Sequence, residues 1–287
     1  MAGGPPCQGF SDSNRRTRSL DNPLNKLYIE FFRFVKALNP PVFLLENVEG
    51  LKTLGNGVVL KSILELGRNC GYDVQWNIVN AQDCGAPQRR RRIFFVGTKM
   101  KIQTVFSLEK SEMINVKQAI SDLPKLENGN RVDPLPYSNN KKLSAYQKRM
   151  RRNNSEQVNN NYVTKNNPLV LRRYDYIPQG GNWKNIPSAL MSNYKKIENC
   201  HRWIYHRLAW NRVSVPINNY RKNMLIHPEQ NRGLSVREAA RLQTIPDDYV
   251  FLGTLESQQQ QVTNLVPPLM AQKIGETIME QLNEAKL

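Results

Sequence analysis

Val42-Phe43-Leu44-Leu45-Glu46-Asn47-Val48 is an apolar run that ends in a carboxylate and an amide. The run is too short for a helix, so it predicts a strand that is buried on both faces. Helical spacing of apolar residues precedes it, from Leu24 to Leu38, and follows it, from Val58 to Asn69. Glu46 is therefore expected where a buried parallel strand ends, which is where open α/β sheets bind their ligands.

Further strands and helices are expected on either side of a long polar region. Residues 74–78 alternate between apolar and polar, and residues 93–97 form a second apolar run. Strands that alternate with helices predict an α/β domain with a largely parallel sheet. Near the other end of the chain, Ser235-Val236-Arg237-Glu238 is a capping box that opens a short helix, and Pro267-Pro268 opens a last one.

The sequence between Lys99 and Asn231 is rich in Asn, Lys and Arg, with aromatic residues interleaved and little periodicity. This pattern predicts a second, loop-rich domain with short strands. Basic residues with scattered aromatics suit a surface that faces DNA. For any single aromatic residue, ordinary hydrophobic packing is the alternative.

The 287-residue chain carries 41 Lys and Arg against 24 Asp and Glu, a net charge of +17. A surplus of this size indicates a polyanionic partner, most simply nucleic acid; a solvated basic surface is the alternative. The four cysteines show neither metal-ligand spacing nor a dense disulfide pattern, which favours a reducing cytosol and argues against a metal site. No apolar run approaches the length of a membrane span. We therefore expect a cytoplasmic protein that binds nucleic acid.

Gly3-Gly4-Pro5-Pro6-Cys7-Gln8-Gly9-Phe10-Ser11 places a cysteine directly after two prolines. Each proline fixes its own φ and biases the preceding residue away from helix, so Cys7 is expected on a stiff, extended turn. Such a turn can hold a sulfur in one place, as a nucleophile requires. For a lone Pro-Cys pair the alternative is a small apolar thiol that packs in a loop.

An arginine run, Gln88-Arg89-Arg90-Arg91-Arg92, directly precedes one of the expected strands. Alone, such a run is usually solvated surface or a phosphate contact. Together with residues 3–11 and Glu46-Asn47-Val48, it resembles the ordered motifs of the DNA cytosine-5 methyltransferases. Three downstream blocks agree in order and spacing: residues 232–243, Pro246-Asp247-Asp248-Tyr249 and Asn264-Leu265-Val266-Pro267-Pro268-Leu269. Six blocks in register are far more specific than one short motif.

The resemblance implies methyl transfer from S-adenosylmethionine to C5 of a cytosine that is flipped out of double-stranded DNA. C5 is a poor nucleophile, so alkylation there requires prior attack at C6, which the resemblance assigns to Cys7. It assigns proton donation near N3 to Glu46, for which a cap or an ion pair with a nearby arginine is the alternative. Arg90 and Arg92 match the family arginines that contact the base and the catalytic groups.

The resemblance also implies binding residues outside this catalytic set. DNA contacts are assigned to Gln8, Ser11, Gln88, Arg232 and Arg237. Gln88 faces structure in the alternative interpretation. The remaining cofactor wall comprises Pro6, Leu27 and Asn264. Two positions depart from the family pattern: Leu24 stands where an arginine is common, and Thr263 where a glycine usually precedes the asparagine.

The family's first strand, its glycine-rich turn and the acidic residues for the cofactor's ribose and adenine have no counterpart in this sequence. We therefore expect a truncated Rossmann-like sheet whose front end is missing, with a second domain for target recognition. The catalytic domain would comprise residues 1–100 and 262–287, and the target-recognition domain residues 101–261. A separate chain that supplies the missing motifs is one interpretation, and a truncated reading frame is another.

Two other functions stay open at this point. One is a DNA-binding remnant that recognises sites without modifying them, and the other is a methyltransferase with the same motifs that acts on transfer RNA. The long basic region favours duplex DNA, because the RNA-directed members lack an extended one. A restriction-modification system is the expected setting.

Overall fold

The computed structural model describes residues 1–6, 26–100, 106, 108–138, 142–152, 155–194, 203–220 and 225–284. The chain forms two compact units. The first comprises Met1–Asn80, Arg91–Lys110 and Ala271–Leu287, and the second Ala81–Arg90 and Ser111–Met270. Residues 81–90 and 262–270, which the sequence placed with the catalytic domain, thus belong to the second unit.

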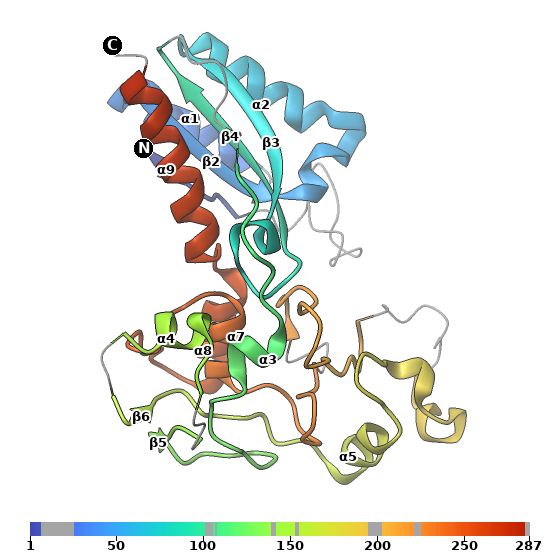
Figure 1. Ribbon diagram of the computed structural model, residues 1–287. Helices are drawn as coiled ribbons and strands as arrows, with labels where there is room; N and C mark the ends of the chain where they lie inside the picture. The colour runs from blue at the N-terminus through green and yellow to red at the C-terminus, as the bar shows by residue number, and fades with distance from the viewer. Residues whose placement is uncertain are drawn as a thin grey trace. The chain divides into compact units, whose positions relative to one another are not determined.

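A mixed sheet forms the core of the first unit (Figure 1). Its strands are β1 (Ala2–Gly3), β2 (Val42–Val48), β4 (Arg91–Thr98) and β3 (Asp73–Asn80), in that spatial order. β1 is parallel to β2, but β4 is antiparallel to both β2 and β3. β1, β2 and β3 therefore run in the same direction, as predicted for an α/β domain, and among the described strands β4 runs against them. The ten residues that join β3 to β4 are too few for the crossover that a parallel neighbour requires, so β4 returns antiparallel beside β3.

The helices of the first unit lie where their apolar periodicity predicted them. α1 spans Leu27–Leu38 and α2 spans Val58–Asn69. The predicted start of α1 at Leu24 lies outside the described residues. α9 spans Pro268–Glu284 and begins at the predicted proline pair. Phe31 and Phe32 of α1 pack edge-on against Phe43 of β2, with ring centroids 5.9 and 5.4 Å apart, which anchors the helix to the sheet.

The strand that is buried on both faces is β4, not β2. In β4 every residue from Ile93 to Thr98 is buried. β2 instead alternates, with Phe43, Leu45 and Asn47 buried and the residues between them partly exposed. Gly97 permits the close packing of β4, because a Cβ there would lie 1.9 Å from Cε1 of Phe43. Glu46 thus belongs to the more open face of β2.

The second unit is rich in loops, as predicted, with short elements between them. In chain order these are α3 (Val116–Ile120), β5 (Leu135–Pro136), α4 (Ala145–Met150), β6 (Gln157–Val158), α5 (Pro168–Asp175), α7 (Val236–Leu242) and α8 (Leu255–Asn264). β5 and β6 pair antiparallel. α7 starts at the predicted capping box, in which Ser235 Oγ accepts from Glu238 N and Glu238 accepts from Ser235 N. The main core of this unit gathers around α3, α7 and α8.

Across the described parts of the chain, no helix combines the length and the apolar character needed to cross a membrane.

Candidate functional site

Glu46 and Arg92 form an ion pair across two neighbouring strands of the first unit. The antiparallel register places Arg92 of β4 opposite Val48, two residues beyond Glu46 on the same face of β2. Arg92 Nε lies 3.0 Å from Glu46 Oε1, and only 13% and 18% of the two side chains are exposed. A guanidinium at this distance stabilises the ionised carboxylate. The ion pair that the sequence left as an alternative for Glu46 is therefore present.

Asn47 ties β2 to the segment that leads toward Cys7. The parallel register of Ala2 with Leu44 extends β1 alongside β2. Asn47 is buried, its Nδ2 donates to the Pro5 carbonyl at 3.3 Å, and its Oδ1 accepts from Val48 N at 2.9 Å. Asn47 had no predicted role within the Glu46-Asn47-Val48 motif. Its inward position in an alternating strand, beside Glu46, is the signal that could have found it.

Gly4 leaves room for the Glu46 carboxylate. A Cβ at Gly4 would lie 3.0 Å from Glu46 Oε2, which is tighter than an ordinary contact. The backbone that precedes the cysteine therefore borders the carboxylate directly. Cys7, Gln8 and Ser11 themselves lie outside the described residues.

The arginine run alternates between inward and outward side chains. Gln88 and Arg90 are buried, whereas Arg89 and Arg91 are exposed, and Arg91 pairs with Glu49 at 3.0 Å. Gln88 Nε2 donates to Leu242 O at 2.8 Å, and its Oε1 accepts from Ile217 N at 3.1 Å. The described contacts of Gln88 are those of its structural alternative, and the DNA contact stays a prediction.

Arg90 belongs to the second unit, where its guanidinium holds two segments together. It donates to Ile217 O at 3.1 Å and Thr263 O at 3.0 Å, and reaches Asn218 Oδ1 at 3.4 Å. Thr263 Oγ1 also donates to the Asn218 carbonyl at 3.0 Å. Arg90 therefore fixes the 217–218 segment against the end of α8. This arrangement makes it a positioning residue among the described contacts.

Comparison with known proteins decides the family. A sequence profile described as C-5 cytosine-specific DNA methylase matches residues 1–280. The chain belongs to this family of DNA methyltransferases. It is 35% identical to the type II methyltransferase M1.HphI of Haemophilus parahaemolyticus over 98% of this chain and 68% of that protein. It is also 35% identical to type II methyltransferase M.DdeI of Desulfomicrobium norvegicum, over 97% of this chain and 72% of that protein.

Solved structures agree with this assignment. A protein from Escherichia coli, described as a prophage-encoded DNA modification methyltransferase, superposes with a TM-score of 0.75 at 26% identity. That match covers 98% of this chain and 78% of the other. The Schizosaccharomyces pombe Dnmt2 methyltransferase shares the fold at 13% identity, with a TM-score of 0.54 over 98% of this chain and 78% of that one. The mixed α/β architecture of this methyltransferase is thus that of its family.

Two arginines of the methyltransferase that were assigned to DNA are buried instead. Arg232, 1% exposed, donates to both carboxylate oxygens of Glu238 at 2.8 and 2.7 Å. Arg237, 0% exposed, donates to the carbonyls of Asn159 at 2.9 Å and Pro246 at 3.0 Å. Burial lowers the pKa of Arg237, with smaller contributions from neighbouring charges. Both side chains thus bind the start of α7 to neighbouring segments of the unit, and their assignment to DNA stays a prediction.

The second arginine of α7 was assigned no role from the sequence. Arg241 is fully buried between two carboxylates, with its Nε 2.6 Å from Asp247 Oδ1 and its Nη1 3.2 Å from Asp122 Oδ1. Burial lowers the pKa of Arg241, but Asp247 and Asp122 raise it and prevail. The spacing of arginines along a helix of small residues was the available signal. The arginines of the 232–243 block thus belong to the buried ion pairs of the second unit.

Use of S-adenosylmethionine follows from the family and the fold, but the three predicted cofactor residues do not form a site for it by themselves. Pro6 is exposed and Leu27 half-buried in the first unit, while Asn264 is exposed in the second and accepts from Gln260 Nε2 at 2.7 Å. One amide and apolar carbon do not match the charged amino-acid end of this cofactor. Among the described residues, no group of three or more His, Cys, Asp or Glu could hold a metal ion.

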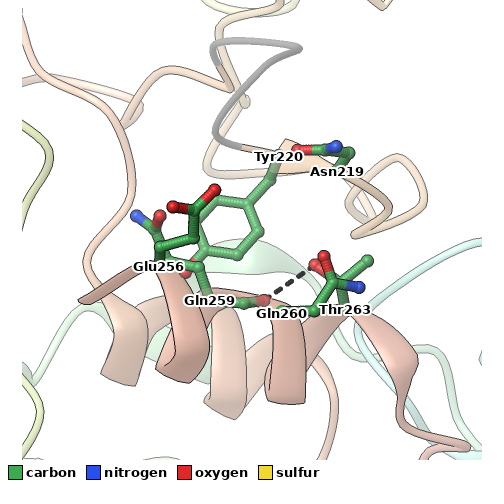
Figure 2. A pocket seen from close by; sticks show the side chains of 6 residues that line it. All are labelled: Asn219, Tyr220, Glu256, Gln259, Gln260 and Thr263. Atoms are coloured by element: carbon green, nitrogen blue, oxygen red, sulfur yellow. Dashed lines mark hydrogen bonds between the residues drawn. The ribbon is translucent and has the colours of Figure 1, made fainter. Parts of the chain in front are cut away.

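A small polar pocket lies beside α8 in the second unit (Figure 2). Its lining residues are Asn219, Tyr220, Glu256, Gln259, Gln260 and Thr263. Thr263 Oγ1 donates to the Gln259 carbonyl at 2.8 Å, the contact dashed in Figure 2. The pocket therefore adjoins the junction that Arg90 holds, and none of its residues carried a sequence motif.

Proposed function

We propose that this methyltransferase transfers a methyl group to C5 of cytosine in a specific double-stranded DNA sequence, within a restriction-modification system. The type II methyltransferases that it resembles support this setting. The observation that carries the chemical proposal is the half-buried Glu46–Arg92 pair, which borders the backbone leading to Cys7. A carboxylate, a guanidinium and a thiol on adjoining segments are the groups that addition to a pyrimidine requires.

The proposed reaction begins at Cys7. Its thiolate adds to C6 of the extruded cytosine, and Glu46 donates a proton at N3, which leaves C5 nucleophilic. S-adenosylmethionine supplies the methyl group when it is bound. A base then removes the C5 proton, the C6–S bond breaks, and the carboxylate of Glu46 recovers the N3 proton. Thiolate, carboxyl proton and aromatic ring are all restored at the end of the cycle.

The Arg92 contact sets a condition on this cycle. A guanidinium in contact with Glu46 favours the ionised carboxylate over the protonated form that could donate. Cytosine O2 is an acceptor that suits a guanidinium, so the entering base competes with Glu46 for Arg92. Transfer of Arg92 to the base frees Glu46 to take up a proton. Proton donation is thereby coupled to occupation of the site.

The cysteine assignment is tested without the cofactor, because addition at C6 makes the C5 hydrogen exchangeable. Duplex DNA that carries tritium at cytosine C5 releases the label to water when the chain adds to the ring. Cys7→Ser is expected to abolish release, whereas Cys70→Ser, which removes a half-buried free thiol elsewhere in the first unit, retains it. Release by Cys7→Ser at the normal rate would refute the assignment.

Two further arms complete the test. On duplex DNA containing 5-fluorocytosine, with S-adenosylmethionine present, the chain is expected to form an adduct that survives denaturation, and Cys7→Ser is not. Glu46→Gln should slow tritium release about 100-fold or more, since it cannot donate the proton, while Glu49→Gln, at the exposed Arg91 pair, should not. A chain that binds duplex but neither exchanges nor traps would favour the alternative, a DNA-binding protein without activity.

A further inference from the structure

We propose that exposed basic side chains on and around α4 form a docking surface for the phosphates of duplex DNA. This basic α4 surface consists of Lys117, Lys142, Lys148, Arg149 and Arg152, all of them exposed. The inference rests on the proposed function, since it takes duplex DNA as the substrate. The basic α4 surface lies outside the catalytic motifs. It would contact DNA phosphates and not the target base.

The helix that carries this surface is firmly seated. Ser144 and Gln147 cap its start reciprocally, and Gln147 Nε2 also donates to Ser121 Oγ at 3.0 Å. On the inner face, Tyr146 and Met150 are buried, and the Tyr146 hydroxyl donates to the Arg241 carbonyl of α7. A helix of six residues would not be stable alone, so these contacts hold its outer face in place. The cations on that face are therefore presented in a fixed arrangement.

The basic residues of this segment divide into one inward group and several outward ones. Arg151 turns inward, with its Nη2 2.6 Å from Asp122 Oδ2 and its guanidinium 3.6 Å from the Tyr137 ring centroid. Asp122 is fully buried and is also bound by Arg241, so it does not offset charge at the surface. Arg151 therefore stabilises the packing of this segment through a buried carboxylate and an aromatic ring.

Four of the outward residues lack such a role. Within the described ranges, neither Lys117, Lys142, Lys148 nor Arg152 has a carboxylate partner in an ion pair. Favourable interaction with the C-terminal helix dipole would account for Lys148 and Arg149 in the last turn of α4 but not for the others. Clustered like charges repel, so a site that gathers them suits a polyanion. The regular phosphates of a duplex are the polyanion that the proposed function supplies.

The experiment measures how binding to a duplex of mixed sequence depends on salt, by fluorescence anisotropy. Each phosphate contact contributes about 0.9 to the slope of log K against log salt concentration. The variant Lys148→Gln/Arg149→Gln/Arg152→Gln should reduce the slope by about 3 and weaken binding at least about tenfold at 100 mM salt. The reduction should be the same on unrelated duplex sequences, because phosphate contacts carry no sequence information.

A matched control removes equal charge elsewhere. Lys36→Gln/Lys61→Gln/Arg68→Gln changes three exposed residues on α1 and α2 of the first unit and should leave the slope nearly unchanged. Arg149→Lys/Arg152→Lys keeps the charge and should retain the slope, which separates electrostatic loss from damage to α4. Circular dichroism of each variant checks that it is folded.

The outcomes separate this inference from the proposed function. A slope that falls only in the α4 Gln variant supports the docking surface. Equal slopes for the α4 variant and the unmodified chain overturn it and leave the proposed function standing, as do equal losses in the α4 and control variants. An α4 Gln variant that loses binding to single-stranded RNA but keeps its slope on duplex DNA would also overturn it. Absence of duplex binding by the unmodified chain at any salt concentration would overturn both.

Discussion

Glu238→Gln tests the ionic core of the second unit most directly. Glu238 is 1% exposed and receives two hydrogen bonds from Arg232 and one from Ser235 N at 2.8 Å. The amide keeps the size of the side chain and one acceptor oxygen, so the capping box survives in part. The substitution removes the negative charge and leaves the Arg232 guanidinium buried without its counterion.

The expected loss follows from the pKa of Glu238. Burial raises this pKa, but the charge and hydrogen bonds of Arg232 lower it more, together with His227 and Ser235, to about 2 from an ordinary 4.5. That difference corresponds to about 3 kcal/mol of stability above pH 4.5. Removal of one partner of a buried pair costs about 3–5 kcal/mol in other proteins. We expect Glu238→Gln to lower the free energy of unfolding by about 3 kcal/mol at pH 7.

The sign of the pH dependence gives a second readout. A carboxyl whose folded pKa is depressed stabilises the protein above its unfolded pKa and loses that effect as pH falls toward its folded pKa. The difference between wild type and Glu238→Gln should therefore shrink by about 1 kcal/mol between pH 7 and pH 4. Urea denaturation followed by circular dichroism at both pH values measures it.

Two further variants test whether the loss comes from the buried ion pair. Glu127→Gln changes an exposed carboxylate of the same unit and should alter stability by less than about 0.5 kcal/mol. Arg232→Met combined with Glu238→Gln should recover part of the loss, because the unpaired buried cation is removed as well. A Glu238→Gln protein within 1 kcal/mol of wild type at pH 7, or a difference that does not change with pH, would refute the reasoning.

Three further substitutions probe other contacts. Burial lowers the pKa of His227 to about 4, so the stability of the protein should fall as pH drops from 6.5 toward 4. In urea denaturation, the midpoint of His227→Asn should decline less over this range than that of the wild type. Equal declines would contradict this prediction. Gly97→Ala should cost about 3 kcal/mol through its clash with Phe43, whereas Gly275→Ala, with open space in α9, should gain about 0.5 kcal/mol by the same denaturation assay. Arg90→Met should lower the melting temperature by several degrees, because three acceptors lose their donor; an unchanged melting temperature would indicate that Arg90 serves only the base.

Local patterns predicted α1, α2, α7 and α9 but not α3, α4, α5 or α8. The spacing of apolar residues gave α1 and α2, the Ser235 capping box gave the start of α7, and a proline pair gave the start of α9. Each of these signals is formed by residues that are close together in the sequence, so it can be recognised without knowledge of the tertiary structure. The family was also within reach of the sequence, since its motifs are short and ordered.

Pairing between distant segments was not predictable in the same way. An apolar run does not show whether the strand beside it is parallel or antiparallel, so the antiparallel direction of β4 was not predicted. The short link between β3 and β4 was a usable signal for it. The arginines at 90, 232 and 237 were assigned to the base or to DNA because they lie in blocks that resemble the family motifs. Their partners are mostly backbone carbonyls, which every residue carries and no sequence pattern marks.

The buried arginines of α7 also govern when the second unit can complete its folding during synthesis. Asp122 and the Asn159 carbonyl leave the ribosome more than seventy residues before α7. Of the two arginines that pair with Asp122 in the described part of the chain, Arg151 is translated before α7 and Arg241 with it. A nascent chain that stops short of residue 236 holds acceptors whose cations have not yet been translated. Folding of the second unit is consequently completed late in synthesis. It requires α7 to emerge, so that Arg241 can pair with Asp122 and Arg237 can donate to the Asn159 carbonyl.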